Sequence, residues 1–345
     1  MLTRLDAIHH LLRIGLVTPG ELLDGTVTVH ESIGRNHMVR VERPDAPSFT
    51  LKQPKDADAP DAMTMWTEAA IFWLTANDPE FGRLAHWLPR YHHYQESNKL
   101  LTIEYVTAAD SLMSKLIAGP VEPALLREVG RAFALLHGAV SRGSAAQPSR
   151  RLFRSDIPWV LTLGSAEARF MPGNPTASAV LGEILRRPDA VAALARARAE
   201  WRTDQVIHGD AKGANVLILD DGSIRIIDWE IAALGDGLWD VAGMVHSLLL
   251  PNPLMPQEPV AVLQARATPW VEALCGGYVE GGIAVRAGDW RETVVRLAGA
   301  RILQTCLEAV HYGGPVPQAL PSLLAVAFEL LVRPEAWKGG WRWAA

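Results

Sequence analysis

The chain has 345 residues, of which 49% are hydrophobic, and its formal net charge is −5 at pH 7. A chain of this length and composition can bury a large core and can form two lobes. The negative net charge provides no general basic surface, so we expect no nucleic-acid partner. The two cysteines, Cys275 and Cys306, are too few for a disulfide framework and lack metal-ligand spacing, which favours a reducing compartment.

Residues 1–17 (MLTRLDAIHHLLRIGLV) contain acidic and histidine side chains inside an apolar pattern. This combination predicts an amphipathic helix rather than a signal peptide. No apolar run reaches the roughly 18 residues expected for a membrane span. We therefore expect a cytoplasmic protein that does not associate with membranes.

Alternating apolar and polar residues predict three strands after this helix. The first two are 26–30 (TVTVH) and 37–42 (HMVRVE), joined by a turn at 34–36. The third, 48–52 (SFTLK), ends in Lys52. A lysine at the end of a strand is by itself most often a solvated edge residue, so a functional role for it requires support from elsewhere in the chain.

Helices dominate the rest of the predicted elements. A helix is predicted over 63–74 (MTMWTEAAIFWL), followed by a strand at 100–106 (LLTIEYV). The segment 123–137 (PALLREVGRAFALLH) predicts an amphipathic helix, because proline stands near its start and its apolar residues recur at helical spacing. Further helices are expected within 152–202 and from 256 to the C-terminus.

The most informative stretch is 206–230, VIHGDAKGANVLILDDGSIRIIDWE. Its two apolar runs flank an Asp-Asp-Gly turn and predict a hairpin. Asp210 and Asn215 stand just before the first run, and Asp228 ends the second. Phosphoryl transfer needs a carboxylate that holds the attacking hydroxyl and oxygen ligands that hold Mg²⁺ against the phosphates. The spacing predicts that these groups meet at one edge of a sheet, as a kinase requires.

The pattern HGDxxxxN followed by IDWExxxxGDGxxDVA resembles the aminoglycoside phosphotransferase and choline kinase-like family, relatives of the protein kinases. The second half covers Ile227 to Ala242 here. The ordered pair of motifs is far more specific than a lone HGD or DW. The resemblance implies an α+β, bilobal, protein kinase-like fold. Its small antiparallel-sheet lobe would span 1–106, and its larger, mostly helical lobe would span 107–345 and carry the catalytic loop 206–230.

The resemblance also implies roles for the polar residues of this loop. Asp210 would orient the acceptor hydroxyl and take its proton, and Asn215 and Asp228 would hold Mg²⁺. Lys212 would pair with the γ-phosphate and stabilise the transferring group. The alternative is that Lys212 is a solvated lysine of the loop without a catalytic role. The cofactors implied are ATP or GTP together with Mg²⁺.

In the N-terminal lobe, the resemblance implies that Lys52 binds the α- and β-phosphates and is held by Glu68 of the following helix. Gly34 and Asn36 would form the loop over the phosphates. This loop has one glycine where protein kinases have G-x-G-x-x-G. Related proteins often have such reduced loops.

The strand at 100–106 would end at the hinge between the lobes. In kinase-type folds the main chain of the hinge binds the nucleotide base. The resemblance therefore implies that Glu104 and Val106 contribute main-chain atoms.

Three other residues are expected to support the catalytic loop. His208 is expected to pack and hydrogen-bond beneath it rather than carry protons. Asp240, at the start of the helix after Gly-Asp-Gly, is expected to accept hydrogen bonds from the loop backbone, with a plain helix-start carboxylate as the alternative. His137 is expected to support the core.

The acceptor is a hydroxyl group, and three functional classes remain open for it. The leading class is a kinase of a small molecule or natural product. The second is a kinase of Ser or Thr in a precursor peptide, with a biosynthetic partner protein; Lys212 and the segment 50–54 (TLKQP) resemble phosphotransferases of modified-peptide biosynthesis. The third, a pseudokinase scaffold, is least favoured because Lys52, Asp210, Asn215 and Asp228 are all present.

The C-terminal sequence bears on the acceptor class. Relatives that phosphorylate polycationic aminoglycosides tend to present acidic side chains around the acceptor, often near the C-terminus. The tail 335–345 (EAWKGGWRWAA) is aromatic and basic instead, which disfavours an aminoglycoside. A long groove beside Asp210 would favour the peptide class, and an enclosed pocket would favour the metabolite class.

Overall fold

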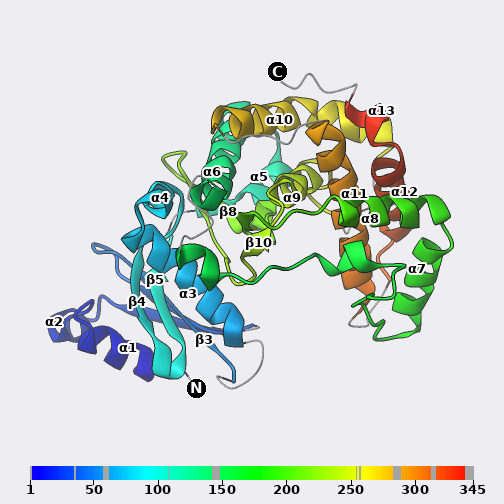
Figure 1. Cartoon of the computed structure of the whole chain (residues 1–345). Coiled ribbons are helices and arrows are strands. Elements are labelled where there is room, and N and C mark those ends of the chain that lie inside the picture. The colour runs from blue at the N-terminus through cyan, green and yellow to red at the C-terminus, as the bar shows by residue number, and fades with distance from the viewer. Residues whose placement is uncertain are drawn as a thin grey trace. The chain divides into compact units, whose positions relative to one another are not determined.

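The computed structural model describes residues 2–34, 36–56, 62–107, 109–141, 148–253, 255, 258–282, 289–311 and 316–338 (Figure 1). Arg35 of the predicted turn and residues 339–345 of the C-terminal tail therefore lie outside the described residues. The chain forms two compact units. The first consists of Met1–Asp110 and Leu217–Ala232, and the second of Ser111–Val216 and Ala233–Ala345. Residues 217–232 thus group with the first unit, whereas the sequence analysis assigned them to the C-terminal lobe; the division into lobes stays a prediction.

The first unit is built on a five-stranded antiparallel sheet with the strand order β1-β2-β3-β5-β4. Its strands are β1 (Thr28–Ile33), β2 (Asn36–Glu42), β3 (Phe49–Pro54), β4 (Tyr91–Gln95) and β5 (Leu100–Glu104). Four of them match predicted strands, and β4 was not predicted. Its sequence, YHHYQ, has no apolar alternation, and all five residues are half-buried.

Alternation divides the sheet into two chemically different faces, because successive side chains of a strand point to opposite sides. Val39, Val41, Phe49 and Leu51 lie on one face and pack with Leu11 of α1 (Arg4–Arg13) in a buried apolar cluster. This cluster explains the apolar stripe of the N-terminal segment. The helix itself begins with a capping box between Thr3 and Asp6, and α2 (Pro19–Leu23) begins with another at Thr18.

The opposite face of the sheet carries the intervening residues, among them Met38, Arg40, Thr50 and Lys52, and it lines a cavity. Helix α3 (Ala62–Asn77) packs against β3, β4 and β5 and carries Glu68. The helices that follow it are α4 (Pro79–Gly82) and the short η1 (Ala85–Trp87) and η2 (Glu96–Asn98).

The predicted hairpin forms as expected. Strand β8 (Val216–Leu219) neighbours β9 (Ile224–Ile226) on one side and β6 (Ala109–Ser111) on the other. Gly222 adopts φ of +81° in the turn, a conformation that favours glycine. The hairpin delivers Asp228 two residues after β9.

The second unit is mostly helical. Its long helices are α6 (Pro123–Ser141), α9 (Leu238–Leu249), α10 (Val260–Glu280), α11 (Trp290–His311) and α12 (Leu320–Val332). Its shorter helices are α5 (Leu112–Ala118), α7 (Pro175–Leu185), α8 (Pro188–Ala199), α13 (Pro334–Lys338), η3 (Pro148–Leu152), η4 (Trp159–Thr162) and η5 (Gly213–Asn215). Helices α6 and α10 pack at very short range, since a Cβ on Gly130 would meet the carbonyl oxygen of Leu274 at 2.0 Å.

A small strand pair leads to the catalytic loop. Strand β7 (Gln205–Ile207) pairs with β10 (Ala233–Gly235) in antiparallel register. The loop begins directly after β7, and α9 begins three residues after β10. The predicted α+β class, with an antiparallel sheet in the N-terminal part and a helical remainder, is confirmed. None of the helices within the described residues is long and apolar enough to span a membrane.

Candidate active site

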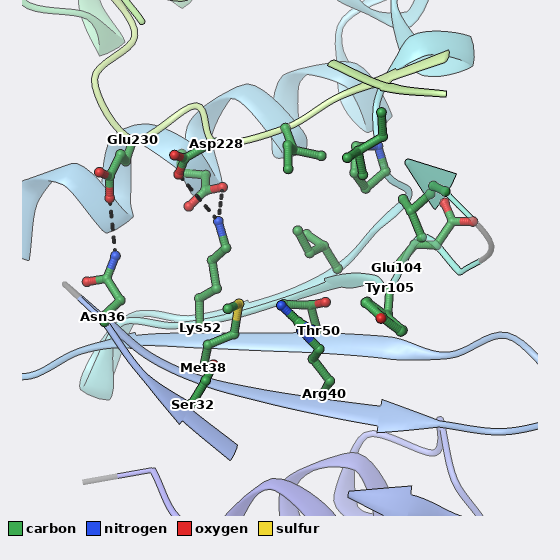
Figure 2. Close-up of a pocket in the computed structure, with 18 of the residues that line it drawn as sticks. Ser32, Asn36, Met38, Arg40, Thr50, Lys52, Glu104, Tyr105, Asp228 and Glu230 are labelled. Atoms are coloured by element: carbon green, nitrogen blue, oxygen red, sulfur yellow. Dashed lines mark hydrogen bonds and ion pairs between the residues drawn. The ribbon is translucent and has the colours of Figure 1, made fainter. Parts of the chain in front are cut away.

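The first unit contains a cavity of about 660 Å³ above the polar face of its sheet (Figure 2). Lys52 projects from β3 toward α3, where its Nζ lies 2.7 Å from Oε1 of Glu68. The same Nζ lies 3.8 Å from Oδ1 of Asp228. A lysine between two carboxylates, in a cavity of this size, is suited to binding a phosphate chain together with a cation.

The charge of Lys52 is secured by its neighbours. Only 16% of its side chain is exposed, and burial alone would lower its pKa. The charges of Glu68 and Asp228 outweigh burial and raise the pKa above the usual value, so the ammonium persists at neutral pH. Glu68 is fully buried, and its Oε2 has no hydrogen-bond partner among the described residues. Its main contact is therefore the lysine.

Asp228 has φ of +68°, in the left-handed region that residues other than glycine seldom occupy. Backbone strain of this kind tends to be retained where a side chain must be aimed at a ligand. Two residues later, Glu230 accepts a hydrogen bond from Nδ2 of Asn36 at 3.2 Å, as Figure 2 shows. Gly34 and Asn36 line the same cavity as Lys52, Glu68 and Asp228, which we call the Lys52 cluster. The loop that was predicted to cover the phosphates therefore borders this cluster.

The end of β5 forms another wall of the cavity, where Glu104 and Val106 both lie. The N–H of Glu104 donates to the carbonyl of Arg90 at 2.8 Å, and the N–H of Tyr105 donates to the carbonyl of Ser48 at 2.8 Å. These two donors are therefore occupied. The Glu104 carboxylate is also engaged, by the N–H of Arg90. That main-chain atoms of Glu104 and Val106 contact a nucleotide base stays a prediction.

The first part of the catalytic loop, residues 208–215 in the second unit, is held by Asp240 of α9. Its carboxylate accepts hydrogen bonds from the N–H groups of His208 at 2.6 Å and Gly209 at 3.0 Å, and from Nε2 of His137 at 3.0 Å. The two main-chain contacts agree with the expectation for Asp240, and the contact with His137 was not predicted. His208 is fully buried and packs against Phe133, as expected for an architectural residue. These contacts rigidify the backbone that presents Asp210.

Two glycines allow the loop its shape. Gly209 has φ of +83°, which admits glycine far more readily than other residues. Gly243 of α9 lies against the loop so closely that a Cβ there would stand 2.2 Å from the carbonyl oxygen of Ala211. Beside it, Oγ of Ser247 accepts a hydrogen bond from the N–H of Gly213 at 2.9 Å. The loop is thus packed directly on α9.

Asp210 contacts two cations. Nη2 of Arg301 lies 2.9 Å from its Oδ1, and Nζ of Lys212 contacts its Oδ2. Burial alone would raise the pKa of Asp210, but the charges and hydrogen bonds of Arg301 and Lys212 outweigh burial and lower the pKa to about 2. Asp210 is therefore ionised throughout the neutral range. It can accept a hydrogen bond from a hydroxyl, which fits a positioning role better than a strong base.

Arg301 was not predicted from the sequence. It lies on α11, only 7% of its side chain is exposed, and its guanidinium stacks over the ring of Trp239 at 5.0 Å. Trp239 in turn donates from Nε1 to the carbonyl of Gly209 at 2.9 Å. A signal existed in LAGARILQ, where an arginine interrupts an apolar helical pattern. Nothing in the sequence, however, indicates which carboxylate it meets 91 residues away.

A smaller cavity of about 220 Å³ opens beside Asp210 and Lys212, within the second unit. Helices α9 and α11 contribute His246 and Arg301 to its lining. The remaining described lining residues are Met113, Ser247, Leu250, Pro251, Pro253, Gln304, Thr305 and Glu308. The sequence analysis did not predict His246 as a site residue.

The candidate metal ligands offer suitable chemistry. Asn215 donates from Nδ2 to the carbonyl of Asp210 at 3.0 Å, which leaves its amide oxygen as the group that can bind a cation. Asp228 supplies a carboxylate from the first unit. Within the described residues there is no cluster of three or more His, Cys, Asp or Glu side chains arranged to hold a metal ion. Mg²⁺ in nucleotide enzymes is bound by one or two carboxylates plus phosphate oxygens, so each of these two side chains offers a donor of a suitable type.

The structure thus gathers the predicted residues into two groups, each described within its own unit. Lys52, Glu68, Asp228, Gly34, Asn36, Glu104 and Val106 line the larger cavity, and Asp210, Lys212 and Asn215 belong to the catalytic loop. Their catalytic roles stay proposals.

A sheet-borne lysine paired to a helix glutamate, followed by an HGD loop and an Asp-ending hairpin, defines a kinase-like phosphotransferase fold. The sequence model of the phosphotransferase enzyme family matches residues 26–274. The match covers more than half of the chain, and the protein belongs to this family. It is a phosphotransferase that acts on a hydroxyl acceptor. No curated protein sequence gives a significant match.

Solved structures with the same fold cover nearly the whole chain. A choline/ethanolamine kinase family protein from Mesorhizobium loti has 19% identity and a TM-score of 0.55, over 96% of each chain. The macrolide 2'-phosphotransferase MphH from Brachybacterium faecium has 18% identity and a TM-score of 0.54, over 95% of this chain and 99% of its own. Amicoumacin kinase hAmiN has 12% identity and a TM-score of 0.58, over 93% and 96%. At these identities the likeness concerns the fold.

Lys212→Ala is expected to lower kcat, on the order of tenfold, while nucleotide affinity changes less. Lys212 contacts Asp210 rather than the Lys52 cluster, so its loss should affect the transfer step more than the binding of the nucleotide. Steady-state kinetics and nucleotide titration of the variant, with Lys212→Arg as the charge-preserving control, measure both quantities. Weakened nucleotide binding with unchanged kcat would contradict a role at the transferring phosphate.

Arg301→Gln is expected to destabilise the protein at neutral pH by up to about 2 kcal/mol, since Arg301 and Lys212 together depress the pKa of Asp210 from 3.8 to about 2. A carboxyl group whose pKa is lower in the folded protein than in the unfolded chain stabilises the fold at every pH above its unfolded pKa. This contribution to stability is lost as the pH falls from about 4 toward 2. The stability difference from wild type should therefore narrow over that range.

Denaturant unfolding at pH 7 and pH 3 measures this difference. Arg296→Gln serves as the control, because Arg296 is a buried arginine of the same helix that contacts Glu200 at 3.5 Å instead. A difference between wild type and Arg301→Gln that is independent of pH would show that Arg301 does not control the ionisation of Asp210.

Proposed function

We propose that this protein transfers the γ-phosphoryl group of ATP to a hydroxyl of a small molecule or natural product, with Mg²⁺ as the cofactor. The observation that carries the proposal is the Lys52 cluster, in which one ammonium lies between the carboxylates of Glu68 and Asp228 inside a large cavity. Lys52 binds the α- and β-phosphates in this proposal, and Glu68 holds it in place.

The nucleotide is assigned to the larger cavity. Its volume of about 660 Å³ lies within the range of roughly 300–1,000 Å³ that suits ligands of nucleotide size. The carbonyl of Glu104 and the main chain of Val106 contact the base, and the loop of Gly34 and Asn36 borders the phosphates. Two structures with the same fold were solved with AMP-PNP and with AMP, which supports an adenine nucleotide. GTP is the alternative donor.

The reaction is a direct in-line transfer. Asp210 accepts a hydrogen bond from the acceptor hydroxyl, orients the oxygen toward the γ-phosphorus, and receives the proton late, because the loose transition state needs positioning more than a strong base. Lys212 stabilises negative charge on the transferring group. Asn215 and Asp228 hold Mg²⁺, which when bound neutralises charge on the phosphate oxygens.

The small cavity beside Asp210 supports a small-molecule acceptor. A precursor peptide would require an extended groove, whereas this cavity is about 220 Å³ and has no Phe, Tyr or Trp among its described lining residues. The peptide kinase, with its biosynthetic partner protein, is therefore the second candidate, favoured by Lys212 in the loop and by the segment 50–54 (TLKQP). A pseudokinase scaffold is the weakest candidate, because the residues that phosphoryl transfer requires are present: Lys52 with Glu68, and Asp210 with Asn215.

The proposal is tested with purified protein, Mg-ATP labelled at the γ-phosphate, and panels of small alcohols and Ser/Thr peptides. Label recovered on a small alcohol, at a rate that depends on both Asp210 and Lys52, is the expected result. Label recovered on peptides alone would establish the second candidate instead. Replacing Mg²⁺ by EDTA should abolish transfer in either case.

A further inference from the structure

The charges that line the small cavity beside Asp210 cancel. Asp210 and Glu308 supply two carboxylates, and Lys212 and Arg301 supply two cations, among the described residues that line it. Asp210 is already paired with both cations. Neither a positively nor a negatively charged acceptor therefore meets an excess of opposite charge here.

The described lining of the cavity also lacks the Phe, Tyr and Trp rings that bind a quaternary ammonium. Such cations are recognised by the faces of aromatic rings, above all Trp and Tyr. In the described part of the chain, its lining contains no Phe, Tyr or Trp. The apolar surface comes instead from Met113, Leu250, Pro251 and Pro253, which can contact hydrocarbon.

His246 is a buried polar group that the catalytic loop does not use. It lies in the last turn of α9, is 8% exposed, and its Nε2 has no hydrogen-bond partner among the described residues. Burial and the nearby charge of Arg301 lower its pKa to about 3, although Asp210 opposes the shift. The ring is therefore neutral, and it offers a donor on one nitrogen and an acceptor on the other.

Gln304 lines the same cavity and contributes a second buried polar atom. Oε1 of Gln304 is buried without a partner among the described residues, while Nε2 of Gln304 donates to Glu308 at 2.8 Å. By contrast, the hydroxyl of Ser247, next to His246, is occupied by Gly213 and Gly243. A buried polar atom without a hydrogen bond lowers stability. A ligand that hydrogen-bonds Nε2 of His246 and Oε1 of Gln304 is therefore favoured over an apolar ligand that leaves both without a partner.

We propose that this cavity binds an uncharged polyhydroxylated group of the acceptor, and that His246 and Gln304 are specificity-determining residues that hydrogen-bond the polar groups beside the reacting hydroxyl. The proposal rests on the proposed phosphotransfer function and names its acceptor class. The cavity volume is below that of drug-sized pockets, so it accommodates a single sugar-like ring or a short polyol segment. The described lining disfavours choline-like and polycationic acceptors, because it offers neither Phe, Tyr or Trp rings nor an excess of carboxylates.

The charge preference is tested with three sugars that share one ring and differ in charge: methyl glucoside, glucosamine and glucuronate. Phosphoryl transfer from labelled ATP is measured for each. Binding is measured separately, from the ring resonances of His246 in isotope-labelled protein, identified by their loss in His246→Gln. The neutral sugar should shift these resonances at the lowest concentration and give a kcat/KM at least about tenfold above the charged sugars.

The residue assignment is tested by kinetics with the neutral sugar. His246→Leu should raise the acceptor KM by at least about tenfold and leave the KM for ATP unchanged, because only the acceptor loses a hydrogen bond. His246→Gln, which keeps a donor and an acceptor, should recover part of the loss. His9→Leu, the same change at an exposed histidine of α1, is the matched control. An acceptor KM unaffected by His246→Leu overturns the assignment.

The outcomes separate this inference from the proposed function. Binding of the neutral sugar at His246 without any phosphoryl transfer would refute phosphotransfer to this class and leave the binding site supported. Transfer that favours glucosamine or glucuronate would refute the acceptor class and support phosphotransfer. Resonances of His246 that do not respond to the neutral sugar overturn the inference directly.

Discussion

Asp210→Asn is expected to lower phosphoryl transfer at least about 10²-fold while the protein still folds and binds nucleotide. The amide keeps the shape of the side chain but has neither the charge nor the proton affinity to hold and deprotonate the acceptor hydroxyl. Nucleotide affinity should persist, because the Lys52 cluster belongs to the other unit. Initial rates with Mg-ATP and nucleotide titration by calorimetry measure the two effects.

The matched control for this variant is Asp221→Asn. Asp221 is exposed in the turn of the β8–β9 hairpin, where it accepts a hydrogen bond from the N–H of Ser223 that an asparagine can also accept. Its activity should remain close to wild type. Turnover near the wild-type level in Asp210→Asn itself would remove Asp210 from the catalytic role.

Lys52→Met is expected to reduce kcat/KM at least about 10²-fold and to destabilise the protein by about 3–5 kcal/mol. The loss of stability arises because the variant leaves the Glu68 carboxylate buried without its hydrogen bond from Lys52, whose Nζ lies 2.7 Å from Oε1. The loss of activity arises because the α- and β-phosphates lose their cation.

A double variant distinguishes these two effects. Lys52→Met with Glu68→Gln removes the buried charge, so most of the stability should return while activity stays low. Lys55→Met, at an exposed lysine just beyond β3, is the control for the substitution itself. Full activity of Lys52→Met, or a double variant as unstable as the single one, would contradict the proposed pairing.

Local patterns predicted the elements of this protein well where burial on one face decides the structure. The strands at 37–42 and 48–52 alternate because one set of side chains packs on α1 and the other lines the cavity. The hairpin before Asp228 was readable from its turn residues. Strand β4 was missed because its residues are polar and half-buried throughout, so pairing with β5 rather than amphipathicity holds it in the sheet.

The residues of the candidate site also divide into those that local motifs predicted and those that only the structure revealed. The HGD and IDWE motifs indicated Asp210 and Asp228, because the chemistry of phosphoryl transfer dictates residue types at short spacing along the chain. Contacts between distant segments carry no such local signal. The pair of Arg301 with Asp210 and the bond of Asn36 to Glu230 join residues 91 and 194 positions apart.

The amino-acid sequence by itself determined the fold class and the family, and it predicted the reactive groups of the catalytic loop, because alternation, turn residues and motif spacing act over a few residues. Only the tertiary structure decided how those groups are charged and what surrounds them. The low pKa of Asp210 and the low pKa of His246 both depend on burial and on nearby charges, above all that of Arg301 on α11. Electrostatics and desolvation act through space, so packing must be known before they can be assigned.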